Sequence, residues 1–147
     1  MVGYRLSLSI SGDNFTPELL KSHIPNGFYI GQIVEKGEVT QISPNHNKRV
    51  ATYSAAYIYS QIDLAVEAEQ ILNVEKQFID FLKNEYKFIQ SICGKDIILN
   101  YDVYFSDTYF NMVVFNTKQL EVLSNYNVNI ALSAMQMSEE DIKNQFD

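Results

Sequence analysis

The hydrophobic pattern at the start of the chain predicts a strand followed by a helix. Apolar and polar residues alternate over positions 4–10, which is typical of a strand with one buried face. Its apolar members are Tyr4, Leu6, Leu8 and Ile10. A polar turn follows at 11–14, and then Thr16 and Pro17 mark a helix start, as N-cap and first helical residue. Leu19, Leu20 and Ile24 are the expected buried stripe of this helix.

The middle of the chain reads as strands and then a long helix. Residues 28–34 and 38–42 flank a short turn at 35–37, which predicts a hairpin. Residues 50–60 predict one long strand, with Tyr57 and Tyr59 on the same face. Residues 65–92 carry apolar side chains at steps of three and four, the period of an amphipathic helix, and Gly94 is its expected C-cap.

The last third of the chain alternates again between strands and short helices. Residues 97–105 predict a strand, 109–115 a returning strand, and 128–134 a final strand. Asn116 begins a predicted capping box for a short helix, and Ser138 is the expected cap of a C-terminal helix. Hairpins are frequent in this order, and few strands are joined by helical crossovers. The sequence therefore predicts an α+β fold over residues 1–147 as one domain, a mostly antiparallel sheet with one long and two to three short helices packed on it.

The charge of the chain is unevenly distributed. The net charge is −7, and residues 1–60 contain four acids against five bases, whereas residues 61–147 contain fourteen acids against six bases. A surface that binds nucleic acid needs clustered Lys and Arg, so this distribution argues against a nucleic-acid partner. It fits a solubilising surface, or steering of a basic protein partner.

Composition argues for a cytoplasmic protein without a cofactor or metal. No apolar run approaches the roughly 20 residues that span a bilayer, and no signal-peptide pattern is present, so no membrane partner is expected. Cys93 is the single cysteine, which excludes an internal disulfide. Its expected position near a helix C-terminus disfavours the thiolate. His23 and His46 are the only histidines and are interpreted as structural.

The chain contains no Gly-rich phosphate-binding loop, no metalloprotease motif H-E-x-x-H and no serine hydrolase motif G-x-S-x-G. The alternative of a small hydrolase rests on Asp102 and Asp107, two carboxylates near each other in sequence, with a nearby tyrosine. A ligand-binding domain of unknown role is a further alternative. We therefore assign no catalytic residues.

Residues 8–25 carry the pattern Ser-Gly-Asp-x-Phe-x-Pro-Glu-x-Leu, which resembles the opening of DUF4279, a bacterial domain family of unknown function. Residues 110–124 and 128–133 are similar to its closing segment, although this chain has Tyr53 or Tyr57 where members often have a tryptophan. The resemblance implies kinship of scaffold and supplies no catalytic residues. Small acidic bacterial proteins of this kind also look like the immunity proteins of toxin–immunity pairs.

The leading functional hypothesis is a non-catalytic protein-binding module, a cytoplasmic immunity protein that neutralises a cognate toxin domain. An acidic patch with aromatic anchors would give fast and specific association with a basic toxin. The oligomeric state is left open. The residues predicted to bind the partner are Glu67, Glu69, Glu75 and Asp80, on the expected exposed side of the long helix, with Tyr57 and Tyr59.

Overall fold

The computed structural model describes residues 2–42, 44, 47–106 and 117–146. The predicted strand 109–115, Asn116, Asp107 and His46 lie outside these residues. The elements in chain order are β1 (Val2–Gly12), η1 (Pro17–His23), β2 (Phe28–Val34), β3 (Val39–Ile42), β4 (Lys48–Val50), β5 (Ser54–Ser60), α1 (Ala68–Ser91), β6 (Asp96–Phe105), α2 (Thr117–Asn125), β7 (Val128–Gln136) and α3 (Glu139–Phe146).

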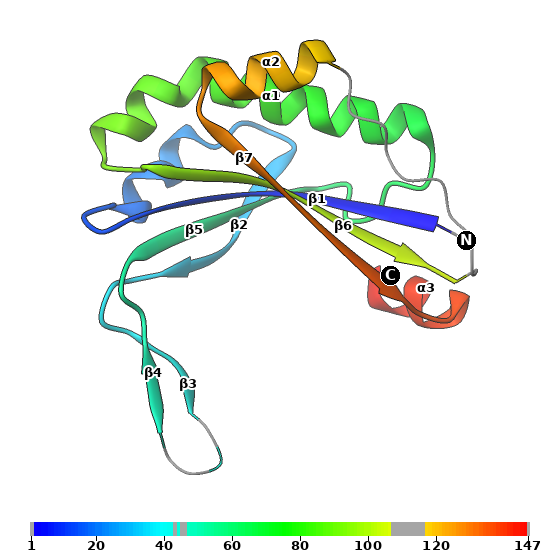
Figure 1. Cartoon of the computed structure of the whole chain (residues 1–147), viewed down its shortest axis with the longest axis horizontal. Helices are drawn as coiled ribbons and strands as arrows, with labels where there is room; N and C mark the ends of the chain where they lie inside the picture. The colour runs from blue at the N-terminus through cyan, green and yellow to red at the C-terminus, as the bar shows by residue number, and fades with distance from the viewer. Residues whose placement is uncertain (1, 43, 45–46, 107–116, 147) are drawn as a thin grey trace.

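Five strands form one sheet in the order β2-β5-β1-β6-β7. All neighbours in it are antiparallel except β6 and β7, which are parallel because the chain returns between them through α2. Figure 1 shows α1 and α2 over one face of the sheet, α3 against the other face, and the β3–β4 hairpin extending away. The predicted fold class, α+β with a mostly antiparallel sheet and one long helix, is confirmed.

The core lies between α1 and the sheet. Alternation along β1 directs Leu6, Leu8 and Ile10 towards α1, and these three side chains are buried. The long helix contributes a matching stripe that includes Phe78 and Ile89, both fully buried. The apolar side chains that repeat every second residue in β1 and about every 3.6 residues in α1 therefore pack into a single hydrophobic cluster.

The predicted hairpin between 28–34 and 38–42 is wrong. β2 pairs with β5, in a register that places Phe28 opposite Ser60, and β3 pairs with β4. The predicted strand 50–60 is likewise divided, because β4 ends at Val50 and β5 begins at Ser54. Phe28 explains the pairing: its ring lies 4.6 Å from that of Phe78, so burial against α1 holds β2 at the sheet edge. Alternation predicts strands, but it does not identify their partners.

The first predicted helix is a short 3₁₀ helix, η1, with Pro17 at its start. Thr16 occupies the expected N-cap position but its side chain makes no capping hydrogen bond. Leu20 is fully buried as expected, whereas Leu19 is 54% exposed, so the prediction of a buried Leu19 is wrong. The tighter 3₁₀ turn rotates successive side chains differently from an α-helix, which moves Leu19 out of the buried stripe.

The C-terminus of α1 ends in a left-handed residue, but that residue is Cys93 (φ 64°) and not Gly94. The N–H of Gly94 donates to the Ile89 carbonyl at 2.9 Å and the N–H of Cys93 to the Gln90 carbonyl at 3.1 Å, which is a Schellman arrangement. Gly94 is required for a different reason. A Cβ on Gly94 would lie 2.6 Å from Cγ2 of Ile89 and 2.8 Å from Cγ2 of Ile10.

Cys93→Gly is expected to raise the free energy of unfolding by about 1 kcal/mol, because glycine adopts the left-handed conformation without the steric cost of a Cβ. Chemical denaturation measures the change. Gly94→Ala is the companion variant and is expected to destabilise, since its Cβ would meet two buried isoleucines. Equal effects of the same sign from both substitutions would contradict this account of the helix end.

The predicted cap of the C-terminal helix is confirmed. The Ser138 hydroxyl accepts a hydrogen bond from the Asp141 N–H at 3.1 Å, at the start of α3. One buried side chain, Ile142, then attaches α3 to the sheet. Within the described residues, none of the helices has the length and apolar character needed to cross a bilayer.

Candidate protein-binding surface

Tyr57 and Tyr59 lie on the sheet face opposite α1. Both are half-buried on β5, and the residues that alternate with them, Ala56 and Ile58, point into the core. The Tyr59 ring stacks on that of Tyr29 from β2 with centroids 5.6 Å apart. We call Tyr29, Tyr57 and Tyr59 the tyrosine face. The structure thus brings the two predicted tyrosines together and adds Tyr29, which sequence reasoning missed because the β2–β5 pairing was not foreseen.

Arg5 lies at the edge of the tyrosine face, on the central strand β1. Its guanidinium carbon is 4.4 Å from the centre of the Tyr59 ring and 5.8 Å from that of Phe146 in α3. Asp102 on β6 is its cross-strand neighbour. Nε of Arg5 is buried and has no hydrogen-bond partner in the structure. Arg5 therefore connects the tyrosine face to α3 through contacts between a cation and aromatic rings.

Asp102, the described member of the proposed hydrolase pair, is held by neighbouring strands. Its carboxylate accepts a hydrogen bond from the hydroxyl of Ser133, the residue opposite it on β7. It also faces Arg5 across the β1–β6 ladder. Because Asp107 lies outside the described residues, the geometry of the pair is not defined, and the hydrolase alternative stays a prediction.

Tyr29 and Tyr57 on this face remain neutral near pH 7. Burial raises the pKa of Tyr29, and a hydrogen bond from its hydroxyl to Asp63 at 2.9 Å raises it further. Burial is also the main cause of the raised pKa of Tyr57 and of Tyr104, which lies near Arg5. A neutral phenol combines a large apolar ring with a hydroxyl, a combination that is frequent at the centre of protein interfaces.

The acidic residues predicted on α1 do not form a single patch. Glu67 and Glu69 are exposed around the first turn, and Asp80 is exposed eleven residues beyond Glu69, about 16 Å along the helix at the usual rise. All three lie on the opposite side of the sheet from the tyrosine face. An interface that included every predicted residue would have to pass around the sheet edge.

The prediction that Glu75 is exposed is wrong, because its side chain is only 1% accessible. Glu75 falls four residues after Ile71 and three before Phe78, which places it within the buried stripe of α1. The helical spacing itself therefore contained the signal. Charged side chains usually lie on the exposed side of an amphipathic helix, and Glu75 is an exception to that rule.

Glu75 and Tyr101 form a buried polar pair inside the core. Tyr101 on β6 is fully buried, and Oε1 of Glu75 has no hydrogen-bond partner in the structure. Burial raises the pKa of Glu75, and hydrogen bonding with the Tyr101 hydroxyl partly opposes that rise. Burial and the neighbouring Glu75 carboxylate raise the pKa of Tyr101. The raised pKa values favour the uncharged forms of both side chains.

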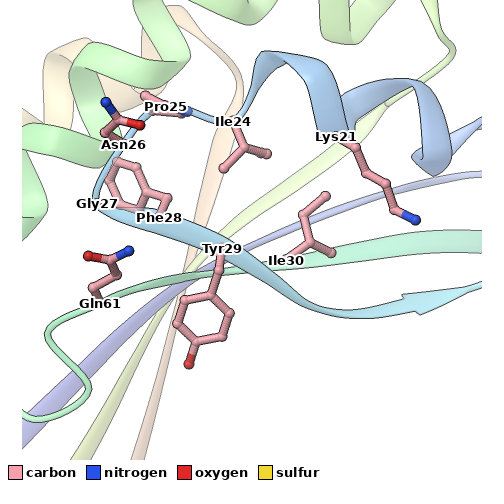
Figure 2. A pocket seen from close by; sticks show the side chains of 9 residues that line it. All are labelled: Lys21, Ile24, Pro25, Asn26, Gly27, Phe28, Tyr29, Ile30 and Gln61. Carbon is pink, nitrogen blue, oxygen red and sulfur yellow. The ribbon is translucent and has the colours of Figure 1, made fainter.

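A surface groove of about 610 Å³ lies beside the start of the edge strand β2. Figure 2 shows Lys21 of η1 at one end of it, and Phe28 and Tyr29 on opposite sides of the β2 ribbon. Gln61, which follows β5, completes the wall. No sequence motif indicates this groove, because its residues come from three segments that only the fold brings together.

A smaller cavity of about 250 Å³ lies between the segment 23–28 and α1. We call it the α1 cavity. Two carboxylate residues line it, Asp80 and Glu85, together with His23. Nδ1 of His23 lies 2.7 Å from Oε2 of Glu85, and the His23 ring stacks on Phe88 with centroids 3.5 Å apart. The predicted residue Asp80 therefore lies at a cavity, whereas Glu67 and Glu69 border a different, open depression.

The remaining candidates from the sequence have structural environments. His23 is fixed between Glu85 and Phe88, and Cys93 terminates α1 in a half-buried position. His46 lies outside the described residues. In the part of the chain that the structure covers, no group of three His, Cys, Asp or Glu side chains is arranged to hold a metal ion.

Comparison with protein families, curated proteins and solved structures finds no match to this chain. The resemblance of residues 8–25 to DUF4279 accordingly stays a prediction from the sequence.

Proposed function

We propose that this chain is a non-catalytic, cytoplasmic protein-binding module, an immunity protein that neutralises a basic toxin domain. The tyrosine face is the observation that supports the proposal. Tyr29, Tyr57 and Tyr59 gather on the sheet face that α1 and α2 leave uncovered. Tyrosine is a frequent anchor in interfaces because one rigid side chain contributes both apolar area and a hydrogen bond.

The edge strand β2 gives one partner access to both sides of the sheet. Tyr29 belongs to the tyrosine face, and its neighbour Phe28 lines both the groove and the α1 cavity. Successive residues of a strand point to opposite faces, so a partner that wraps around β2 contacts the tyrosines and Asp80 together. The acidic character of residues 61–147 favours a basic partner.

The direct test is to search the reading frames adjacent to this gene for a toxin domain and to co-express that domain with this protein. We expect cells that produce both proteins to survive and the two to purify as a complex. Death of cells that contain soluble immunity protein, with no complex after purification, would show that the proposed function is wrong.

Within such a complex, Tyr57→Ala is expected to weaken affinity about 30-fold, the effect of a loss of roughly 2 kcal/mol at an interface hot spot. Isothermal titration calorimetry measures the dissociation constant. Tyr126→Ala is the matched control, because Tyr126 follows α2 and packs against Tyr86 of α1, away from the tyrosine face. If Tyr126→Ala weakens binding as much as Tyr57→Ala does, the partner does not use the tyrosine face.

A further inference from the structure

The carboxylate of Asp80 at the α1 cavity has no charged partner among the described residues. Among the residues that line the cavity, Asp80 and Glu85 are acids, and none is lysine or arginine. Asp80 is exposed and makes no hydrogen bond or ion pair with any described residue, whereas Glu85 is engaged by His23. The Asp80 carboxylate therefore leaves one negative charge at the cavity without a partner among the described residues. A cation is the ligand that this charge distribution attracts.

The other lining groups favour a planar cation over a compact one. Phe28 and Phe81 line the cavity with the small parts of their side chains that stay exposed, 8% and 4%, and a guanidinium is more weakly hydrated than an ammonium, so it loses less on contact with these apolar atoms. The side-chain amides of Asn26, Gln77 and Asn84 supply additional hydrogen-bond acceptors at its rim. A guanidinium presents five N–H donors in one plane, so it can use the carboxylate and several of these oxygens together.

The size of the cavity limits the occupant to a single side chain. Its volume is about 250 Å³. Pockets for small-molecule ligands measure on the order of 300–1,000 Å³. We infer that the α1 cavity is an anchor site for one arginine side chain of the protein partner, with Asp80 as the charged contact. This inference rests on the proposed function for its source of arginine, but the chemistry of the cavity can be tested without the partner.

The test uses the intact, ¹⁵N-labelled protein and the tripeptide acetyl-Gly-Arg-Gly-amide, followed by NMR. The matched ligand carries citrulline, which replaces the guanidinium with a neutral urea group of nearly the same shape. We expect the arginine peptide to shift the side-chain amide signals of Asn26, Gln77 and Asn84 saturably. The citrulline peptide is expected to bind at least about tenfold more weakly, a difference of 1.4 kcal/mol. Asp80→Asn is expected to raise the dissociation constant of the arginine peptide at least about threefold.

Glu69→Gln is the control variant, because it removes the same charge from an exposed position of α1 outside the cavity. We expect it to leave peptide binding unchanged. The inference is overturned if Glu69→Gln and Asp80→Asn weaken binding equally, if a lysine peptide binds as tightly, or if no saturable shift occurs. Loss of peptide binding with toxin neutralisation intact removes only this inference. Peptide binding without neutralisation removes only the proposed function.

Discussion

Replacing Glu75 with glutamine is expected to stabilise the protein at pH 8 and to change its stability little at pH 4. Glu75 is almost completely buried, and one of its carboxylate oxygens has no hydrogen-bond partner in the structure. A buried polar group without a partner costs about 1–3 kcal/mol, and a charged group costs more. Glutamine keeps the shape and a carbonyl acceptor for Tyr101 but never ionises. We therefore expect a gain of at least about 1 kcal/mol at pH 8.

The direction of the pH dependence follows from the raised pKa of Glu75. In the unfolded chain this carboxyl titrates near its ordinary pKa of 4.5, whereas in the folded protein it holds its proton to higher pH. Between these two pKa values the folded state binds more protons, so the free energy of unfolding falls as pH rises. Its contribution is fully present below the unfolded pKa and is lost as pH rises through the folded pKa.

Urea denaturation of both proteins at intervals from pH 4 to pH 8 measures this difference. The other titrating groups are common to both, so subtracting the two curves isolates Glu75. Glu69→Gln serves as the control, because an exposed acid on the same helix is expected to change stability by less than about 0.5 kcal/mol at every pH. A difference between wild type and Glu75→Gln that does not grow with pH would contradict the assignment of Glu75 as a buried, unsatisfied carboxyl.

Ile142→Ala is expected to detach α3 while the rest of the protein stays folded. Ile142 is fully buried, and the other described side-chain contacts of α3 with the sheet include the Phe146 ring, 5.0 Å from Tyr104. Truncating a buried isoleucine to alanine costs about 2–5 kcal/mol. A helix of eight residues is not stable without tertiary contacts, so we expect this loss to appear as local opening.

Hydrogen exchange detects the opening directly. A loss of at least 2 kcal/mol corresponds to about 30-fold lower protection of the α3 amides, whereas amides at the centre of α1 are expected to change little. Lys143→Ala, at the exposed neighbouring position, is the control and is expected to leave the protection of α3 unchanged. Equal loss of protection in α1 and α3 would show that α3 is part of the global unfolding unit.

Detachment of α3 also bears on the proposed function. Phe146 covers one side of Arg5, and Arg5 contacts the ring of Tyr59 on the tyrosine face. If the partner binds the tyrosine face alone, Ile142→Ala is expected to affect partner binding less than Tyr57→Ala does. Positions at the edge of an interface contribute less than the aromatic residues at its centre.

Local patterns predicted the elements of this fold better than their partners. The alternation in β1, the helical spacing of α1 and the Ser138 cap depend on neighbouring residues, and each is confirmed. The prediction of a hairpin over residues 28–42 is wrong because the strand that pairs with β2 is β5, more than twenty residues further along the chain. The burial of Phe28 against Phe78 decides that pairing, and no local pattern expresses a contact with a helix still further along the chain.

The candidate surfaces divide in the same way. The sequence by itself determined the α+β class, an acidic second half, and a strand that places Tyr57 and Tyr59 on one face, because these follow from composition and periodicity. Only the tertiary structure added Tyr29 to that face, buried Glu75 beside Tyr101, and placed Asp80 at a cavity with Phe28 and His23. Such groupings depend on which distant segments pack together, and packing is a property of the whole folded chain.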